Sequence, residues 1–234
     1  LKNNMNIAII TARGGSKRIP KKNIKIFCGK PIIYWVIKAV KKSKIFDKII
    51  VSTDSKKIAK IVKNYNIDVP FIRPKQFSGD RVSTLKVIIH AIKWLIKNNC
   101  KPTYVCCIYP TAAFIRSSDI LKGYKAIKKN KNSFILSGSS FVSSVSRSFY
   151  KTSKNKLKMI FSKNYFKRTQ DLKKIYYDAG QFYWGSKNSW LTTKTILNNS
   201  SDIVYIPKWI AIDIDTHEDW KKAEKFAKLN KLIK

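Results

Sequence analysis

The stretch that decides the fold is residues 6–23, NIAIITARGGSKRIPKKN. Residues 6–11 form a short apolar run that is typical of a buried strand. Residues 12–23 contain two glycines and a proline among basic side chains, which predicts a loop at the carboxyl end of that strand. A strand that runs directly into a basic, glycine-containing loop is typical of the opening of a nucleotide-binding α/β fold.

The pattern continues outward from this loop as helix, strand and helix. Apolar residues at helical spacing over 33–40 predict the first helix, and residues 47–53 predict a second strand. Ser55 is expected to cap a helix that reaches residue 64. This order of elements predicts a mainly parallel sheet flanked by helices.

The remainder of the chain extends the same α/β pattern within a single domain, residues 1–234. We expect an extended piece at 71–74, strands at 104–109, 134–137, 178–185, 203–206 and 209–212, and helices at 84–97, from Ser117 or Ser118 to 129, and from Thr216, where residues 216–219 resemble a capping box. Between 138 and 174 the periodicity weakens into Ser- and Lys-rich segments with scattered aromatic residues, which predicts an inserted arm.

The net charge of +36, from 49 Lys+Arg against 13 Asp+Glu, would suit a protein that binds nucleic acid or an anionic membrane. However, 42 of the basic residues are Lys, and Ile and Asn are abundant too. Drift of the gene toward A/T-rich codons therefore explains the charge without a polyanionic partner. The 44% of hydrophobic residues exclude a disordered polycation.

Other features of the sequence predict a cytoplasmic protein. No apolar run approaches the roughly 18 residues of a membrane span. The first residues lack the apolar segment and cleavage site of a signal peptide. The four cysteines lack the spacing of metal ligands, which fits a reduced compartment.

The loop RGGSKR, residues 13–18, has the chemistry of a triphosphate cradle. Its glycines allow main-chain N–H groups to approach a ligand, and its side chains supply positive charge and a hydroxyl group. It matches neither the Walker A motif nor GxGxxG. A solvated basic turn is the alternative, but two arginines in a Lys-rich chain argue against it.

Four acidic residues gather within seven positions near the end of the chain. Asp213 and Asp215, two residues apart, lie on one face if the segment is extended, and two carboxylates suit Mg²⁺. Compensation of a helix N-terminus is the alternative, and it fits Glu218 and Asp219. For Asp54, after the second strand, helix capping and nucleotide contact both stay open.

The sequence shows no Cys-His or Ser-His pair and no nucleophile elbow. A phosphate cradle with a metal site but without a covalent nucleophile favours direct nucleotidyl transfer. In that reaction, positioning and charge neutralisation supply most of the catalysis.

Eight segments together resemble the acylneuraminate cytidylyltransferases, and within them the branch that acts on pseudaminic acid. The resemblance runs in order over residues 6–226. The segments are ARGGSKRIPKKN (12–23), GKPII (29–33), VSTD (51–54), FIRP (71–74), YPTA (109–112), RTQDL (168–172), DAGQFYWG (178–185) and DIDTHEDW (213–220).

This resemblance implies a nucleotide-diphospho-sugar transferase type, Rossmann-like fold and a homodimer joined through the arm at 138–174. It also implies transfer of CMP from CTP to the anomeric hydroxyl of a nonulosonic acid, with release of pyrophosphate. The expected partners are therefore CTP, the sugar acid and a second copy of the chain, without nucleic acid or membrane.

The resemblance further implies roles for individual residues. Arg13, Lys22 and Asp215 would form the catalytic set, and Asp213 and Asp215 would hold Mg²⁺. CTP contacts fall on Ala12, Arg13, Gly14, Gly15, Ser16, Lys17, Lys22, Asn23, Arg73, Asp80 and Ser83. Sugar contacts fall on Tyr109, Arg168, Gln170, Asp178 and Gln181, with Arg168 on the sugar carboxylate, a task suited to its planar fork.

Three positions depart from the family pattern: Thr11, Ala113 and Tyr177. Tyr177 touches the expected sugar pocket, so N-acetylneuraminate and legionaminate stay open beside pseudaminate. Two hypotheses from other functional classes are that the chain is a basic nucleic-acid-binding protein or an inactive paralogue. Retention of both Asp213 and Asp215 argues against inactivity.

Overall fold

The computed structural model describes residues 5–129, 133–141 and 144–232. Its helices are α1 (Ile32–Ser43), α2 (Lys56–Lys63), α3 (Thr84–Lys97), α4 (Ser117–Lys129), α5 (Lys187–Thr192) and α6 (His217–Leu229). Its strands are β1 (Met5–Thr11), β2 (Ile26–Phe27), β3 (Lys30–Pro31), β4 (Lys48–Ser52), β5 (Pro102–Ile108), β6 (Phe134–Ser140), β7 (Phe149–Lys151), β8 (Leu157–Met159), β9 (Tyr176–Ser186) and β10 (Asp202–Tyr205).

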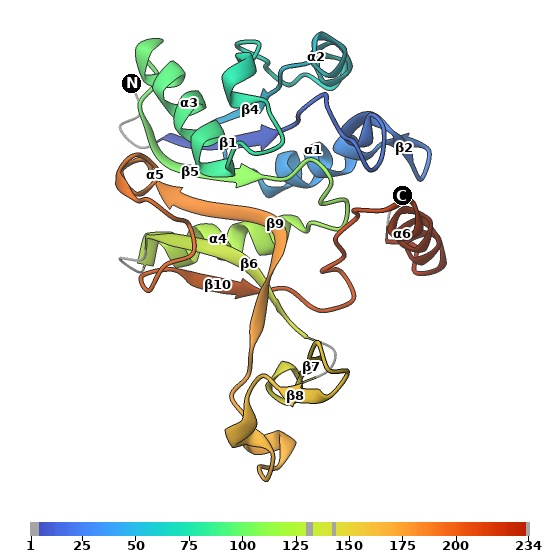
Figure 1. Cartoon of the computed structure of the whole chain (residues 1–234). Helices are drawn as coiled ribbons and strands as arrows, with labels where there is room; N and C mark the ends of the chain where they lie inside the picture. Colours follow the sequence, from blue (N-terminus) through green and yellow to red (C-terminus); the bar gives the residue numbers. More distant parts are fainter. Residues whose placement is uncertain (1–4, 130–132, 142–143, 233–234) are drawn as a thin grey trace.

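The main sheet of the described residues has the strand order β10-β6-β9-β5-β1-β4 (Figure 1). β1 runs parallel to β4 and β5, and β10 runs parallel to β6. β9 is antiparallel to both of its neighbours, β5 and β6. The sheet is therefore mixed and mainly parallel, which confirms the predicted fold class.

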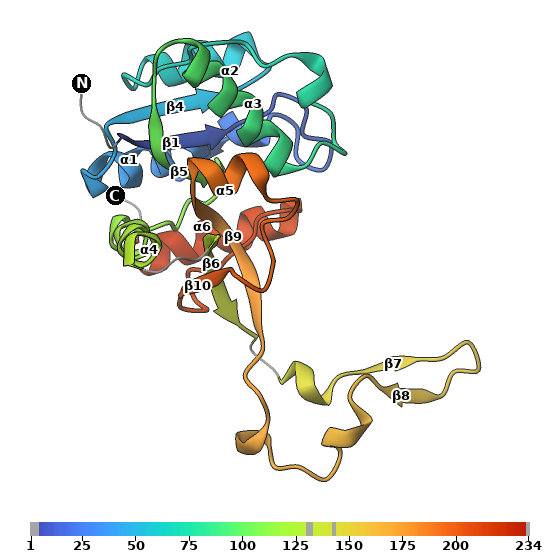
Figure 2. The ribbon, with the colours of Figure 1, turned by 90° about the vertical axis from the view of Figure 1, so that its left-hand side faces the viewer.

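Apolar residues cover both faces of this sheet, which explains why polar and apolar residues do not alternate along β1. Ile7 and Ile9 pack on the face that carries α3 and α5, whereas Ala8 and Ile10 pack on the face that carries α1 and α4. Figures 1 and 2 show these helices on opposite sides of the strands. The core thus buries β1 between β5 and β4 and holds the following loop at the carboxyl end of these strands.

Two local predictions are wrong. Residues 209–212 form a turn and loop instead of a strand, because the Ile210 N–H donates to the Pro207 carbonyl and the Ile210 side chain points into the core. Ser117 and Ser118 lie inside α4 instead of capping it. The backbone carbonyl of Arg116 accepts from the first turn, and its guanidinium binds the buried carboxylate of Asp119.

The helix expected from Thr216 forms as α6. The Thr216 hydroxyl accepts from the Asp219 N–H at 3.1 Å, and the Asp219 carboxylate accepts from the Thr216 N–H at 2.8 Å. This reciprocal pair is a capping box with Asp in its third position. It sets the direction in which α6 leaves the acidic segment.

The segment between β6 and β9 projects away from the sheet as an arm that carries the β7–β8 hairpin (Figure 2). Residues 138–140 of the range predicted for the arm still pair with β9 and belong to the sheet. Residues 142–143 of that range lie outside the described residues. Several large apolar side chains of the arm are exposed, and Phe166 reaches 94%. No helix in the described part of the chain has the length and apolar character to cross a membrane.

Candidate active site

A cleft of about 240 Å³ opens where β1 and β5 end. Eight of the residues predicted to bind substrates line it: Arg13, Ser16, Lys17, Lys22, Asn23, Arg73, Asp80 and Tyr109. They come from the loop after β1, the segment between β4 and α3, and the end of β5. Because β1 and β5 are parallel neighbours, both of their carboxyl ends meet at this edge. The fold therefore brings together residues that are up to 96 positions apart in sequence (109 − 13).

Hydrogen bonds hold the backbone of the basic loop at the mouth of this cleft. The buried side chain of Asn23 donates through Nδ2 to the Arg13 carbonyl at 2.8 Å. The Gly14 N–H donates to Asp54 Oδ1 at 2.7 Å. The Ala12 N–H bonds the Ser52 carbonyl, and the Ala12 side chain is buried in the core. Gly15 is exposed beside Gly14. The loop thus has a defined backbone while its charged side chains face the cleft.

Two carboxylates neutralise the cations of the loop. Asp80 binds both Arg13 and Lys17, the latter at 2.7 Å. Asp215 binds Arg18 Nη1 at 2.8 Å and Lys22 Nζ at 3.2 Å. The hydrogen bond from Lys17, and then the contact with Arg13, hold the pKa of Asp80 below its usual value. The cleft therefore has four cations positioned to bind an anion of high charge, such as a triphosphate.

Lys22 also joins the basic loop to the acidic segment. Its ammonium group donates to the Ile214 carbonyl at 2.6 Å, and its side chain is only 17% exposed. Ile214 is buried, so the flanking carboxylates of Asp213 and Asp215 are held at the surface. The acidic pair thus lies beside the cations expected to hold the phosphates.

The electrostatics of this pair fit a divalent cation. The pKa of Asp213 is raised, first by partial removal of its carboxyl from water, although the side chain remains exposed, and then by the negative charge of Asp215. Two carboxylates that repel each other are a suitable donor set for Mg²⁺, which takes its other ligands from water and substrate phosphates. No cluster of three or more His, Cys, Asp or Glu side chains suited to a metal occurs among the described residues.

Arg73 forms a buried wall of the cleft. Its guanidinium lies 3.9 Å from Asp54 Oδ1 and near the Ser52 carbonyl and the Ser78 hydroxyl. Burial lowers the pKa of Arg73, and the positive charge of Arg13 adds to that effect, whereas Asp54 opposes it. The Arg73 guanidinium has no acceptor atom, so it can only donate hydrogen bonds to a ligand.

A second cavity of about 290 Å³ adjoins the first, because Thr84 and Tyr109 line both. The predicted residues Ser83, Tyr109 and Asp178 lie here, with Tyr183. The Thr84 and Tyr109 hydroxyls are hydrogen-bonded at 2.7 Å, and the Tyr183 hydroxyl donates to the Asp178 carboxylate. Burial raises the pKa of Tyr183 strongly, so this phenol stays protonated and acts as a donor. The cavity therefore combines these polar groups with apolar side chains such as Leu85 and Leu136, and it lies next to the cleft.

Three residues predicted to contact the sugar do not line these two cavities. Arg168 and Gln170 are on the projecting arm, where Arg168 is 75% exposed and binds Asp171 at 3.0 Å. Gln181 is a buried residue of β9 and donates through Nε2 to the Ile210 carbonyl at 2.8 Å. Its Oε1 has no hydrogen-bond partner among the described residues. Gln181 thus joins the sheet to the loop before α6.

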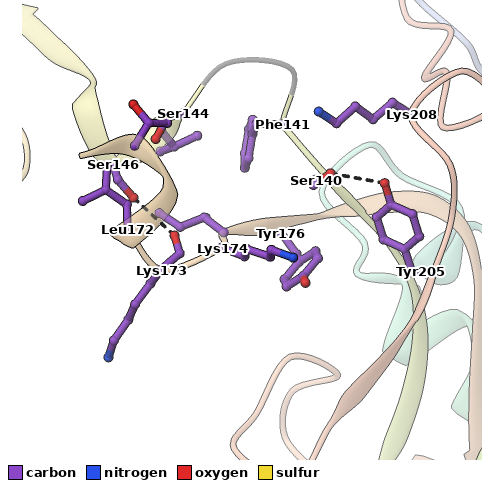
Figure 3. Close-up of a pocket in the computed structure, with 13 residues that line it drawn as sticks. Ser140, Phe141, Ser144, Ser146, Leu172, Lys173, Lys174, Tyr176, Tyr205 and Lys208 are labelled. Carbon is purple, nitrogen blue, oxygen red and sulfur yellow. Dashed lines mark hydrogen bonds between the residues drawn. The ribbon is translucent and has the colours of Figure 1, made fainter. Parts of the chain in front are cut away.

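A larger cavity of about 480 Å³ lies at the root of the arm (Figure 3). Phe141, Tyr176 and Tyr205 line it together with Lys173, Lys174 and Lys208, and none of its lining residues is acidic. None of the residues predicted to bind CTP lines it either. By size alone this cavity would be taken as the active site. The smaller cleft is the better candidate, because it has the glycine-containing loop and the neighbouring acidic pair.

Sequence reasoning missed several residues of the cleft, since Thr84, Pro110 and Thr111 line it as well. Arg18, which the sequence placed in the cradle loop, also lines the cleft and contacts Asp215. Asp54 neither caps α2, which Ser55 does, nor lines the cleft as described.

A basic loop after the first strand, a mainly parallel sheet and an acidic pair beside the loop define a nucleotide-binding α/β protein with the architecture of a nucleotidyltransferase. The chain belongs to the cytidylyltransferase family, whose model matches residues 7–232. It is therefore an enzyme of the nucleotidyltransferase class, as the sequence predicted.

The chain is 37% identical over 225 residues to the pseudaminic acid cytidylyltransferase of Campylobacter jejuni, covering 96% of this chain and 97% of that one. It is 29% identical to the CMP-N,N'-diacetyllegionaminic acid synthase of Legionella pneumophila, with the same coverage. The solved structure of CMP:2-keto-3-deoxy-manno-octonic acid synthetase complexed with CTP shares the fold at a TM-score of 0.71 and 12% identity, covering 97% of this chain and 100% of that one.

Proposed function

We propose that this enzyme transfers CMP from CTP to the anomeric hydroxyl of pseudaminic acid and releases pyrophosphate. The observation that carries the proposal is the full-length similarity to the Campylobacter jejuni enzyme. The geometry agrees with it, because a cleft with four phosphate-loop cations adjoins a second pocket through Thr84 and Tyr109. One cavity would hold the nucleotide and the other the sugar acid.

In this proposal the triphosphate replaces the carboxylate of Asp80 on Arg13 and Lys17. Lys22 binds the phosphates while its contact with the Ile214 carbonyl keeps the loop near the acidic pair. Asp213 and Asp215 hold Mg²⁺, which would neutralise charge on the phosphates. The protein's contribution is then positioning and fixed positive charge, so the sugar hydroxyl attacks the α-phosphorus directly.

The nucleoside would be held by groups that the fold places around the cleft. Asn23 is assigned to the ribose, and Arg73 with the loop from Asp80 to Ser83 is assigned to the cytosine. Arg73 can only donate hydrogen bonds, which suits the acceptor atoms O2 and N3 of cytosine. Asp178 and Tyr109 are assigned to the sugar acid, where the hydrogen bond from Tyr183 keeps Asp178 in place.

The proposed active form is a cytoplasmic homodimer joined through the arm. Phe149, Tyr150, Leu157, Tyr165 and Phe166 are exposed along the arm, which is the kind of apolar surface that a second copy would cover. Arg168 and Gln170 lie on the same arm. In the proposed dimer they would reach the sugar pocket of the partner, where Arg168 would bind the sugar carboxylate.

The dimer is tested by sedimentation equilibrium of the wild type and of Phe166→Ser. We expect twice the chain mass for the wild type and a weakened dimer for the variant. An inactive Arg168→Ala chain mixed with an inactive Asp215→Asn chain should recover activity if the arm acts on the partner. A monomeric wild type with full activity would contradict the proposed dimer.

The substrate is tested by incubating the purified enzyme with CTP, Mg²⁺ and one sugar acid at a time. The panel contains pseudaminate, N-acetylneuraminate and N,N'-diacetyllegionaminate, and pyrophosphate release is followed. We expect the highest kcat/KM with pseudaminate. A higher value for either other acid would reassign the substrate, and no release with any of them would refute the proposed reaction.

A further inference from the structure

Asp54 follows β4 and lies behind the cleft, between the basic loop and Arg73. Its neighbour Ser55 caps α2 by accepting from the Ile58 N–H at 3.3 Å, so the cap does not need Asp54. Asp54 is also not among the side chains that line the cleft in the described part of the chain. A half-buried carboxylate that neither caps a helix nor faces the ligand needs another explanation.

The same oxygen of Asp54 contacts both sides of the nucleotide cleft. Oδ1 accepts from the Gly14 N–H at 2.7 Å and lies 3.9 Å from Arg73 Nη2. The first contact spans 40 positions and fixes the backbone of the phosphate loop. The second places a negative charge beside the buried guanidinium assigned to the base.

The loop approaches the end of β4 closely at Gly14. A Cβ atom on Gly14 would lie 3.0 Å from Cβ of Ser55 and 3.8 Å from Oδ1 of Asp54. A side chain at position 14 would therefore press on Ser55, and the loop or Ser55 would have to shift by a few tenths of an ångström. The hydrogen bond from the Gly14 N–H to the Asp54 carboxylate thus holds the main chain of the loop against the end of β4.

Arg73 depends on the same carboxylate. Its other polar contacts, with the Ser52 carbonyl and the Ser78 hydroxyl, are long at 3.4 Å. Among the described residues, Asp54 is the only acid recorded within 4.0 Å of this guanidinium. Arg13 repels it from the cleft side. The Asp54 charge thus partly offsets the buried cation at 3.9 Å, without a direct hydrogen bond to it.

We propose that Asp54 is a positioning residue for CTP, which holds the Gly14 backbone and the Arg73 guanidinium in one binding arrangement. The hydrogen bond to Gly14 is the main contact, because it is short and direct, and the ion pair with Arg73 is secondary. This inference rests on the proposed function in taking CTP as the ligand. It predicts that perturbing Asp54 weakens CTP binding and leaves the sugar-acid pocket unaffected.

The test compares Asp54→Ala, Asp54→Asn and the matched control Ser55→Ala. Binding of CTP is measured by calorimetry, and KM for CTP and for the sugar acid is measured in the transfer reaction. Asp54→Ala should weaken CTP binding by about tenfold or more, the factor expected for loss of one hydrogen bond to a charged group. Asp54→Asn keeps an acceptor for Gly14, so its affinity should lie within about threefold of wild type. Ser55→Ala keeps its Cβ, loses only the cap, and should bind CTP normally.

Gly14→Ala breaks the contact from the other side and keeps the test informative if Asp54→Ala does not fold. It should raise KM for CTP while KM for the sugar acid is unchanged. Combining it with Asp54→Ala should add little to the effect of either change alone, because both changes remove one contact. Normal CTP affinity in Asp54→Ala, or equal weakening by Asp54→Asn and Asp54→Ala, would overturn the inference. Failure of the wild type to bind CTP would instead refute the proposed function and, with it, this inference.

Discussion

Asp215→Asn separates catalysis from stability more clearly than any other single change in this protein. Asp215 is 35% exposed, and its two cationic partners are Arg18 at 2.8 Å and Lys22 at 3.2 Å. The pair with Arg18 is open to solvent and that with Lys22 is partly buried, and pairs of this kind contribute about 0–1 kcal/mol each to folding, so about 2 kcal/mol at most together. Each kcal/mol moves the Tm of a chain of this size by about 2–4 °C. The variant should therefore melt within about 8 °C of the wild type.

The effect on turnover should be much larger. If Asp215 holds Mg²⁺ beside the phosphates, its loss removes a group that stabilises the transition state, which costs on the order of 10²–10³ in kcat. The requirement for Mg²⁺ should also shift to higher concentrations, because Asp213 alone would remain. Initial rates over a range of Mg²⁺ concentrations, with thermal melts of the same samples, measure both effects.

Glu218→Gln is the matched control for this prediction. Glu218 lies three residues further along, is 74% exposed and pairs only with Lys222, at 2.6 Å, among its described contacts. It should leave both kcat and the Mg²⁺ requirement unchanged. An Asp215→Asn enzyme with kcat within about threefold of wild type and an unchanged Mg²⁺ requirement would refute the metal assignment. Equal losses in both variants would show that general charge, not ligation, is responsible.

Three further changes test other parts of the structure. Asp80→Asn should lower KM for CTP several-fold in initial-rate assays, since the triphosphate no longer displaces a carboxylate from the loop cations; a raised KM would show that Asp80 helps to hold the nucleotide. Thr216→Ala should lower the free energy of unfolding by about 1 kcal/mol in urea titrations at pH 7. An unchanged free energy of unfolding would contradict the cap. The Thr216 hydroxyl also donates to the Asp219 carboxylate and so lowers the pKa of Asp219 from 3.8; this part of the difference is present above pH 3.8 and is lost as the pH falls through the folded-state value. Gly123→Ala should destabilise the protein by about 1–3 kcal/mol despite the better helix propensity of Ala, since its Cβ would lie 2.6 Å from Trp184 Cδ1; a higher Tm would contradict the tight packing.

The elements that sequence reasoning predicted well depend on short-range patterns. The helix at residues 84–97 has the predicted bounds because its apolar residues recur at helical spacing and Ser83 is its N-cap. The cap of α6 was predictable because its partners are three residues apart. The turn at residues 209–212 was not, because a short apolar run is equally compatible with a strand and with a buried loop.

The order of strands, helices and the basic loop was enough for the sequence alone to determine the α/β class, and the resemblance of eight segments was enough to predict the family. Only the tertiary structure decided which charges meet. It paired Gly14 with Asp54, Arg13 with Asp80 and Lys22 with Asp215, over separations of 40, 67 and 193 residues. It also showed that Arg168, within the predicted arm, does not line the two cavities of its own chain. The physical reason is that such contacts depend on strand order and on where each loop leaves the sheet, and local periodicity carries no information about either.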